Sequence, residues 1–196
     1  SEFNETPSAS ASLGQIYRAR MRDSGREVAA KAQKPGIRKP IHTDLEILSW
    51  LAEQIHDNIP GLRPFDLPTV LEELREGILR EIDFSTEARN ASVFNSLNQY
   101  PEKVFAPEVL TEYSTPRLLI SEWIDGKSPD EVTLGEEDRK EIARTGGNSF
   151  FSQIVITGFF HGDPHPGNIL ITPDRRVCLL DWGLAGQLTA RMRYAL

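Results

Sequence analysis

The stretch HGDPHPGNIL at residues 161–170 and the stretch LLDWG at residues 179–183 carry the polar side chains that decide the fold of this chain. Asp163 and Asn168 lie five residues apart in the first stretch, and Asp181 stands between an apolar run and Trp-Gly in the second. Carboxylate and amide oxygens suit Mg²⁺, a hard cation that binds few protein ligands together with phosphate and water oxygens. Asn168 and Asp181 are therefore predicted to hold a metal ion, while Asp163 can orient or deprotonate an attacking hydroxyl.

These spacings match those of protein kinases. A histidine two residues before Asp163 completes the spacing of the catalytic loop H-R-D-x-x-x-x-N, and DWG at residues 181–183 stands where a kinase keeps its metal-binding D-F-G. Far upstream, VAAK at residues 28–31 matches V-A-I-K on a predicted strand. Because the protein contributes mainly positioning and charge stabilisation to phosphoryl transfer, a lysine must meet the phosphates of ATP or ADP. We therefore predict Lys31 and Asp163 as catalytic residues of a protein-kinase-like fold, with Ala29 beside the nucleotide.

The composition is that of an ordinary globular domain. The 196 residues are 39% hydrophobic and 26% charged, and a formal net charge of −7 argues against nucleic-acid binding through a basic surface. Cys178 lies in an apolar run and is expected to be a small core residue. The most apolar long stretch, residues 150–160, falls well short of the ~20 residues of a membrane span. The chain is therefore expected to be soluble, and we interpret it as a piece of a longer protein. His165 lies near the predicted metal ligands, but a structural role in the loop is favoured.

The predicted strands and helices alternate in the manner of an α+β chain. Strands are predicted at residues 15–21, 27–33, 104–110, 117–122, 169–172 and 176–180. Helices are predicted at residues 41–55, from a capping box at 69–72 to about residue 94, and at 136–157. This order predicts a small, mostly antiparallel sheet lobe with a long helix over residues 1–124, followed by the beginning of a mainly helical lobe over residues 125–196.

Two helices carry more detailed expectations. The first is expected to bury one apolar face, formed by Leu45, Leu48, Leu51 and Ile55. The last contains Gly146-Gly147, and each glycine costs roughly 1 kcal/mol relative to alanine in a helix. The pair therefore suggests either close packing or a break in that helix.

At these motifs the chain resembles the UbiB family (UbiB/ADCK), the atypical protein-kinase-like proteins associated with ubiquinone and other prenyl-quinone metabolism. The resemblance rests on the alanine-rich loop at 9–14, on VAAKAQKPGI at 28–37, on EIDFSTEARNA at 81–91, and on HGDPHPGN at 161–168 followed by DWG. The second and third are quite specific together. HGDPHPGN is less specific, because aminoglycoside-phosphotransferase-like enzymes carry similar loops.

The resemblance implies roles that spacing does not. Glu87 would be the helix glutamate that pairs with Lys31. Glu81 and Asp83 look like the E-x-D motif of the family, which in relatives contacts an N-terminal K-x-G-Q segment folded over the active site. This sequence contains no K-x-G-Q stretch. Without the resemblance, a solvated acidic helix face would be the favoured interpretation of Glu81 and Asp83.

The resemblance also assigns the nucleotide loop and the hinge. By itself, ASASLG at residues 9–14 is more typical of a linker than of a G-x-G-x-x-G loop. In the family pattern, Ala9 and Ala11 replace the first two glycines and Gly14 remains. A methyl group at each position blocks positive φ values and close backbone approach, so we expect an altered nucleotide preference and poor transfer to proteins. Glu122 and Ile124 fall at the hinge that would meet the adenine edge.

The function that the resemblance implies is an ATP- or ADP-binding, Mg²⁺-dependent atypical kinase or ATPase that supports quinone-lipid metabolism. It would hydrolyse ATP or phosphorylate an unidentified substrate, in contact with quinone-pathway proteins or lipid intermediates at a membrane surface. The full-length protein would be associated with the bacterial inner membrane, a mitochondrion or a plastid. Two alternatives stay open: a small-molecule phosphotransferase of the aminoglycoside or choline type, and a pseudokinase scaffold that binds nucleotide without turning it over.

Overall fold

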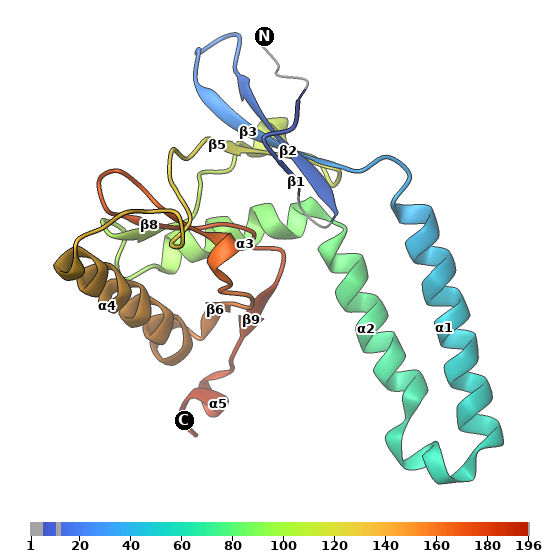
Figure 1. The fold of residues 1–196 in the computed structure, drawn as a ribbon. Helices are drawn as coiled ribbons and strands as arrows, with labels where there is room; N and C mark the ends of the chain where they lie inside the picture. The colour runs from blue at the N-terminus through green and yellow to red at the C-terminus, as the bar shows by residue number, and fades with distance from the viewer. Residues whose placement is uncertain (1–5, 11–12, 196) are drawn as a thin grey trace.

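The computed structural model describes residues 6–10 and 13–195 of the chain. The N-terminal part is an antiparallel sheet with the strand order β1-β2-β3-β5 (Figure 1). Its strands are β1 (Ala9–Ser10), β2 (Gly14–Arg20), β3 (Glu27–Gln33) and β5 (Leu118–Glu122). Ala11, which the resemblance assigns to the nucleotide loop, lies outside the described residues.

Alternation along β3 separates the core from the face that carries the lysine. Val28 and Ala30 are buried and pack with Ile120 of β5. Ala29 and Lys31 occupy the intervening positions, and successive side chains of a strand point to opposite faces of the sheet. Lys31 is therefore directed away from the sheet core and toward the rest of the molecule.

Short strands and Trp182 build a second core. One sheet has the order β4-β8-β7, and β6 pairs with β9 in another. Trp182 is 1% exposed and stacks on Phe94 with ring centroids 4.5 Å apart. Cys178 is buried in β8, as expected of a core cysteine. The strands are β4 (Val104–Phe105), β6 (Phe159–His161), β7 (Ile169–Ile171), β8 (Val177–Leu179) and β9 (Ala185–Gln187).

The chain passes from the first sheet to the second core just after β5. Lys127 and Ile171 exchange two backbone hydrogen bonds, with N···O distances of 3.0 and 2.8 Å. These bonds attach the segment after Glu122 to the edge of β7. The division that the sequence suggests at residue 124 falls in this segment and stays a prediction.

Helices make up most of the remaining structure. The α-helices are α1 (Arg38–Asn58), α2 (Leu67–Glu81), α3 (Phe84–Leu97), α4 (Glu136–Ser152) and α5 (Ala190–Arg193). Short 3₁₀ turns are η1 (Pro60–Phe65), η2 (Thr111–Tyr113) and η4 (Pro166–Asn168). A π-helical turn, η3 (Gln153–Thr157), continues α4.

The chain breaks between α2 and α3, so the single long helix predicted there is wrong. Asp83 has an extended backbone (φ −99°, ψ 101°), and its carboxylate accepts the Ser85 N–H at 2.9 Å as the N-cap of α3. The carbonyl of Ile82 accepts a hydrogen bond from the Gln33 side chain at the end of β3. These contacts end α2 and fix the start of α3 against the sheet.

Two predicted boundaries also differ from the structure. Thr69 does not cap α2, because the helix begins at Leu67 and the Thr69 hydroxyl donates to Asp66 at 2.7 Å. The strand predicted from residue 104 ends at Phe105. Pro107 follows two residues later and cannot donate a backbone hydrogen bond to a sheet ladder, which is consistent with the early end.

The helix predicted at 136–157 is α-helical only as far as Ser152 and then widens into the π turn η3. Gly146 and Gly147 neither break it nor pack closely, since a Cβ added at either one would meet nothing within 4 Å. The expectation drawn from this glycine pair is therefore wrong. The helix tolerates both residues at the cost of its own stability.

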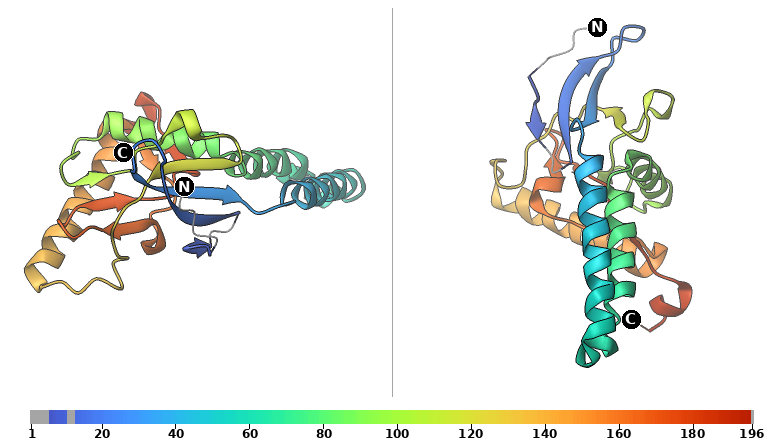
Figure 2. Two further views of the ribbon diagram at one scale, coloured as in Figure 1. Left: turned by 90° about the horizontal axis from the view of Figure 1, so that it is seen from above. Right: turned by 90° about the vertical axis from the view of Figure 1, so that its right-hand side faces the viewer.

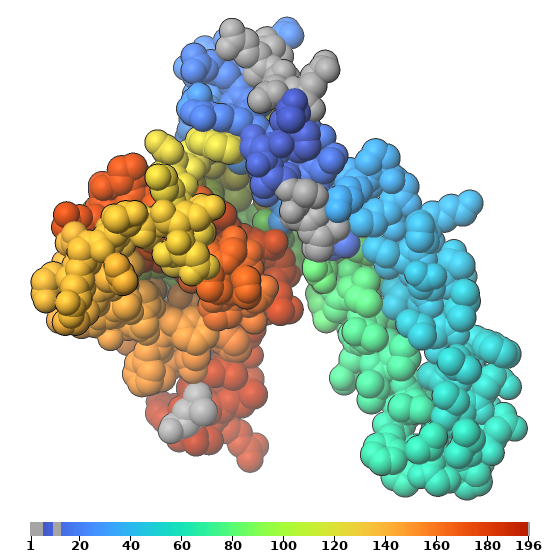
Figure 3. Space-filling view, in the orientation of Figure 1, coloured from blue at the N-terminus to red at the C-terminus, as the bar shows by residue number. Residues whose placement is uncertain are grey.

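The helices α1 and α2 form a hairpin that stands out from the rest of the molecule (Figures 1 and 2). The space-filling view shows it as an arm separated from the body by an open notch (Figure 3). Leu45 of α1 is buried, but Leu48 and Leu51 are 42% and 44% exposed, so the predicted apolar face is only partly buried. The reason is that α2 covers one side of α1. Within the described residues, no helix is long and apolar enough to cross a membrane.

The N-cap of α3 gives a test of the break. Asp83→Ala is expected to lower the free energy of unfolding by about 1 kcal/mol, whereas Asp83→Asn retains most of it because asparagine caps equally well. Glu81 is exposed, so Glu81→Ala serves as the control and should change stability by less than ~0.5 kcal/mol. Denaturant unfolding of the intact protein measures all three variants. Equal losses for Asp83→Ala and Glu81→Ala would contradict the capping role.

Candidate active site

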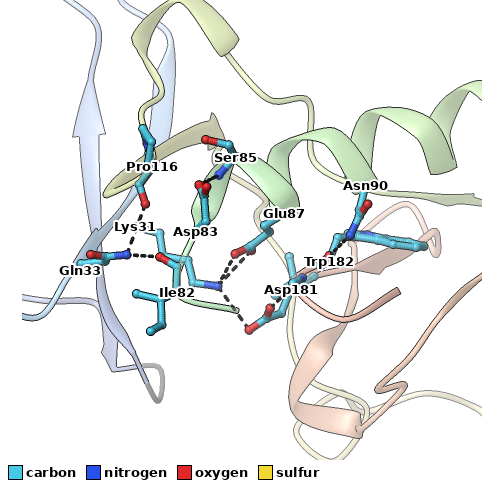
Figure 4. A network of polar contacts seen from close by, with 12 residues as sticks. Lys31, Gln33, Ile82, Asp83, Ser85, Glu87, Asn90, Pro116, Asp181 and Trp182 are labelled. Carbon is cyan, nitrogen blue, oxygen red and sulfur yellow. Dashed lines mark hydrogen bonds and ion pairs between the residues drawn. The ribbon is translucent and has the colours of Figure 1, made fainter. Parts of the chain in front are cut away.

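The centre of the site is an ammonium group between two carboxylates (Figure 4). Lys31 Nζ lies 2.7 and 3.0 Å from the two carboxylate oxygens of Glu87, and 3.3 Å from Asp181 Oδ2. The three residues come from β3, from α3 and from the segment after β8. The side chains of Lys31 and Glu87 are 12% and 10% exposed, whereas that of Asp181 is 40% exposed. Lys31 and Glu87 thus form a largely buried pair, and Asp181 faces the opening.

The charges of this cluster do not balance. Burial by itself would lower the pKa of Lys31, but the negative charges of Glu87 and Asp181 outweigh burial and raise that pKa above its ordinary value. Lys31 therefore carries its proton throughout the physiological range. Burial raises the pKa of Glu87 above its ordinary value, and the Lys31 ammonium 2.7 Å away opposes that rise. With both carboxylates ionised, one positive charge faces two negative charges. A site of this kind has a remaining attraction for a cation, and the accessible carboxylate of Asp181 is the group that can meet it.

Close packing beneath the cluster holds Lys31 in place. The Lys31 ammonium lies 5.2 Å from the centre of the Phe84 ring, in the geometry of a cation–π contact. Gly14, at the start of β2, approaches both elements so closely that a Cβ there would lie 2.9 Å from the Ala32 carbonyl oxygen and 3.3 Å from the Phe84 ring. Gly14 is therefore required for packing between the sheet and α3, in addition to any contact with a nucleotide.

The residues of the predicted catalytic loop are held together by His161, which is 1% exposed. Its Nδ1 accepts the backbone N–H of Asp163 at 3.1 Å, so the ring proton resides on Nε2, which donates to the Leu180 carbonyl at 2.8 Å. The side-chain amide of Asn168 donates to Asp163 Oδ2 at 3.1 Å. The backbone N–H of Leu180 donates to the Asn168 carbonyl at 2.8 Å. These bonds place Asp163 and Asn168 beside the segment that leads into Asp181.

The segment after β8 is shaped so that Asp181 faces outward while its neighbour is buried. Asp181 has a left-handed backbone conformation (φ 52°), which is unfavourable for a residue with a Cβ. Trp182 compensates by filling the core, and its carbonyl accepts a hydrogen bond from the Asn90 side chain at 2.9 Å. The Gly183 N–H donates to Asp181 Oδ1 at 3.3 Å. Local strain of this kind is stored at functional sites more often than elsewhere.

The described residues assigned to the nucleotide loop and hinge lie in β1, at the start of β2, in β3, at the end of β5 and just beyond it. Ala9 lies in β1 opposite Ile16, in extended backbone that suits alanine. Ala29 shares the face of β3 that carries Lys31. The backbone N–H of Glu122 is already used, since it donates to the Glu108 carbonyl at 2.8 Å. Ile124 lies beyond the end of β5 in irregular backbone, where a hinge would be.

Two further observations concern metal binding. His165 is exposed, and its Nδ1 accepts the Gly167 N–H at 3.1 Å, which is the structural role expected for it. In the described part of the chain, no group of three or more His, Cys, Asp or Glu side chains could hold a metal ion. A site made of Asp181 and Asn168 has two protein ligands and depends on phosphate oxygens for the rest.

Sequence reasoning missed three residues that support the site. Phe84 and Asn90 both lie in the stretch EIDFSTEARNA, and Asn90 follows Glu87 by three residues on the same helix face. A polar residue at that spacing could have indicated a buried contact. Gln153 accepts the backbone N–H of His161 at 3.0 Å. No local sequence signal marks it.

The profile of the ABC1 atypical kinase-like domain matches residues 1–196. The chain belongs to this family. The predicted resemblance to UbiB proteins is confirmed by relatives such as the probable protein kinase UbiB of Aliivibrio fischeri, which is 34% identical over 95% of this chain and 36% of its own length. An uncharacterized aarF domain-containing chloroplast protein kinase of Arabidopsis thaliana is 38% identical over 98% of this chain and 27% of its own length. The chain thus spans about a quarter to a third of these relatives.

Solved structures confirm the protein-kinase-like fold of this ABC1 domain. A Mycobacterium tuberculosis protein solved as a complex with erythromycin superposes with a TM-score of 0.79 and 30% identity, covering 99% of this chain and 48% of that one. The Rio2 kinase of Chaetomium thermophilum, solved as an ADP/Mg²⁺-phosphoaspartate complex, has a TM-score of 0.58 and 11% identity, covering 98% of this chain and 51% of that one. The second likeness bears on the fold and not on the chemistry.

The buried pair makes a prediction about proton affinity. Glu87→Gln removes the negative charge closest to Lys31, leaving Asp181 alone to oppose burial, so the pKa of Lys31 is expected to fall. With a lower pKa, a larger fraction of Lys31 is the neutral amine at a given alkaline pH. Lys31 should therefore react faster with an amine-directed reagent, measured by peptide mass spectrometry as a function of pH.

The control for this experiment is Glu108→Gln, which removes a carboxylate that pairs with Arg26 on the exposed surface. That variant should leave the labelling profile of Lys31 unchanged. An unchanged profile in Glu87→Gln as well would show that Glu87 does not set the protonation of Lys31.

Proposed function

We propose that this ABC1 domain binds a magnesium–nucleotide and transfers or hydrolyses its terminal phosphate. The observation that carries the proposal is the contact of the Lys31 ammonium with both Glu87 and Asp181. Catalysis of phosphoryl transfer requires a positioned lysine and oxygen ligands that hold a metal ion. The cluster offers both, and the protonated state of Lys31 suits it to the phosphates of ATP or ADP.

The residues present fit a magnesium ion. Asp181 offers an accessible carboxylate, and Asn168 offers an amide oxygen once its NH₂ group is bonded to Asp163. Oxygen ligands of this kind, few in number, suit Mg²⁺ bound to phosphates. When bound, the ion would neutralise the charge on the phosphates. The net negative charge of the cluster is the electrostatic reason for it to bind there.

The other residues of the chain act by orientation. Glu87 directs the Lys31 ammonium, which would bind phosphate oxygens as the carboxylate of Asp181 turns to the metal. Asp163 would orient the attacking hydroxyl or water and accept its proton, and the amide of Asn168 holds that carboxylate in position. The backbone of Ile124 would meet the adenine edge. Gly14 and Ala9 flank the loop that would cover the phosphates.

We place this activity in quinone-lipid metabolism, with quinone-pathway proteins or lipid intermediates at a membrane surface as partners. The support is the resemblance to UbiB proteins, a name that the bacterial relatives carry. The Asp163→Asn variant described below distinguishes this proposal from a nucleotide-binding pseudokinase. A small-molecule phosphotransferase would instead phosphorylate a soluble alcohol stoichiometrically.

Two substitutions in the intact protein test the proposal. Asp181→Ala is expected to weaken nucleotide binding in the presence of Mg²⁺ by on the order of tenfold, about 1.4 kcal/mol, and to abolish the difference between binding with and without Mg²⁺. Asp163→Asn should retain nucleotide binding but lower turnover by about 10²–10⁴-fold, because it removes the base and keeps the shape. Calorimetric titration and phosphate release measure the two effects.

Asp130→Asn provides the control, since Asp130 is exposed and lies between β5 and α4. Equal affinity of the wild type for nucleotide with and without Mg²⁺ would contradict the metal site. Turnover that survives Asp163→Asn, with binding intact, would favour a scaffold over an enzyme.

The alanine loop makes a separate prediction. Ala9→Gly is expected to raise the affinity for ATP relative to ADP by roughly tenfold, which corresponds in free energy to about one hydrogen bond. The reason is that glycine permits the close approach of the backbone to phosphate that a methyl group blocks. Ala143→Gly, on the exposed face of α4, controls for a general loss of stability. Unchanged ATP and ADP affinities in Ala9→Gly would remove the proposed effect of the methyl groups.

A further inference from the structure

A small cavity lies behind the catalytic loop, between the end of α3 and the junction of α4 with η3. Phe94, Leu97 and Phe159 form apolar parts of its wall. Ser149, Ser152 and Gln153 form a polar part. The cavity measures about 10 Å³, close to the smallest volume that holds one buried water molecule.

The polar side chains of the wall lack partners. Ser149 Oγ, Ser152 Oγ and Gln153 Nε2 are buried, and none of them has a hydrogen-bond partner among the described residues. The three residues are only 2%, 4% and 4% exposed. Buried polar atoms are almost always hydrogen-bonded, and each one left unpaired is costly. Three such atoms lining one cavity point to a common partner.

Other polar side chains of the wall are bonded elsewhere. The side-chain amide of Asn98 donates to the Val104 carbonyl at 2.6 Å and its oxygen accepts the Tyr100 N–H at 2.9 Å. The Thr157 hydroxyl donates within η3, to the Gln153 carbonyl at 2.9 Å. The Gln99 side chain, also in the wall, donates to the Leu97 carbonyl at 2.9 Å. None of these wall groups pairs with the three atoms, which points to a partner inside the cavity.

We propose that the cavity binds one ordered water molecule, which accepts a hydrogen bond from Gln153 Nε2 and bonds both serine hydroxyls. A water can make up to four hydrogen bonds, and buried waters typically make about three. Each serine hydroxyl can donate or accept, so all three partners are compatible with one water. The π turn is consistent with this role, because π-helical insertions occur frequently at functional sites.

The water would make Gln153 a positioning residue for the catalytic loop. Gln153 Oε1 accepts the backbone N–H of His161 at 3.0 Å, and the His161 ring bonds the Asp163 N–H and the Leu180 carbonyl. A partner on Nε2 fixes the rotation of the Gln153 amide and so fixes this acceptor. The link from His161 to catalysis rests on the proposed function, but the water and the His161 hydrogen bond do not.

The first test is structural. A crystal structure of the intact protein, at a resolution that shows ordered waters, should place one water within hydrogen-bond distance of Ser149 Oγ, Ser152 Oγ and Gln153 Nε2. An empty cavity would overturn the proposal. So would a side chain from outside residues 1–196 that fills the cavity.

The second test does not depend on activity. The double variant Ser149→Ala/Ser152→Ala keeps the packing volume but removes two of the partners of the water. The amide hydrogen of His161 should then exchange with solvent about tenfold faster, measured by hydrogen exchange with NMR or mass spectrometry. Asn148→Ala, an exposed position on the same helix, is the matched control and should leave that rate unchanged. Equal exchange rates in the double variant and the control would overturn the proposal.

Turnover provides the third readout. Loss of positioning should lower kcat, expressed per folded molecule, about tenfold in the double variant with KM for the nucleotide unchanged. Lost stability alone would reduce the folded fraction and leave kcat per folded molecule at the wild-type value, so the folded fraction is measured alongside turnover. Gln153→Met, which removes the acceptor itself, should lower kcat at least as much. If the wild type showed no turnover, the proposed function would fail while the crystal and exchange results still decided the water site. A wild type that turns over but a double variant with normal kcat would contradict the positioning role.

Discussion

The structure depends on one ammonium group shared by two carboxylates. Lys31 comes from the first sheet, Glu87 from α3 and Asp181 from the segment after β8, so this contact is where separate parts of the chain meet. A buried ion pair of this kind contributes little net stability, but removing either partner leaves an uncompensated charge. Net stability by itself therefore does not explain why this ion pair is present.

The helix α3 holds that contact together. Its N-terminal end is tied to β3 through Ile82 and Gln33. One face then presents Glu87 to Lys31, Asn90 to the Trp182 carbonyl, and Phe94 to the Trp182 ring. These residues follow one another at helical spacing. A single helix face thus connects Lys31, the segment that contains Trp182 and the second core, which explains why its start must be set by a definite cap.

The sequence indicated the site better than it indicated the helices. Lys31, Asp163, Asn168 and Asp181 could be singled out because the expected chemistry restricts both residue type and spacing, and the structure places Lys31 against Asp181 and Asn168 against Asp163; their roles stay predictions. The break at Asp83 could not, because a cap residue inside an amphipathic stretch is also compatible with a helix interior. The apolar face of α1 was overestimated, since periodicity says which residues share a face but not whether a neighbour covers it. The contact of Gln153 with His161 arises from a π turn that has no sequence signature.

The hairpin of α1 and α2 is inserted between the two halves of the buried pair. The chain enters it seven residues after Lys31 and leaves it six residues before Glu87. Its first helix has 21 residues, which corresponds to about 30 Å at 1.5 Å per residue. Both ends of this long arm are anchored next to the ion pair. The backbone that leads into the arm thus continues from the strand of Lys31, and the backbone that leaves it continues into the helix of Glu87, so a displacement of the arm would reach both partners of the ion pair through very short connections.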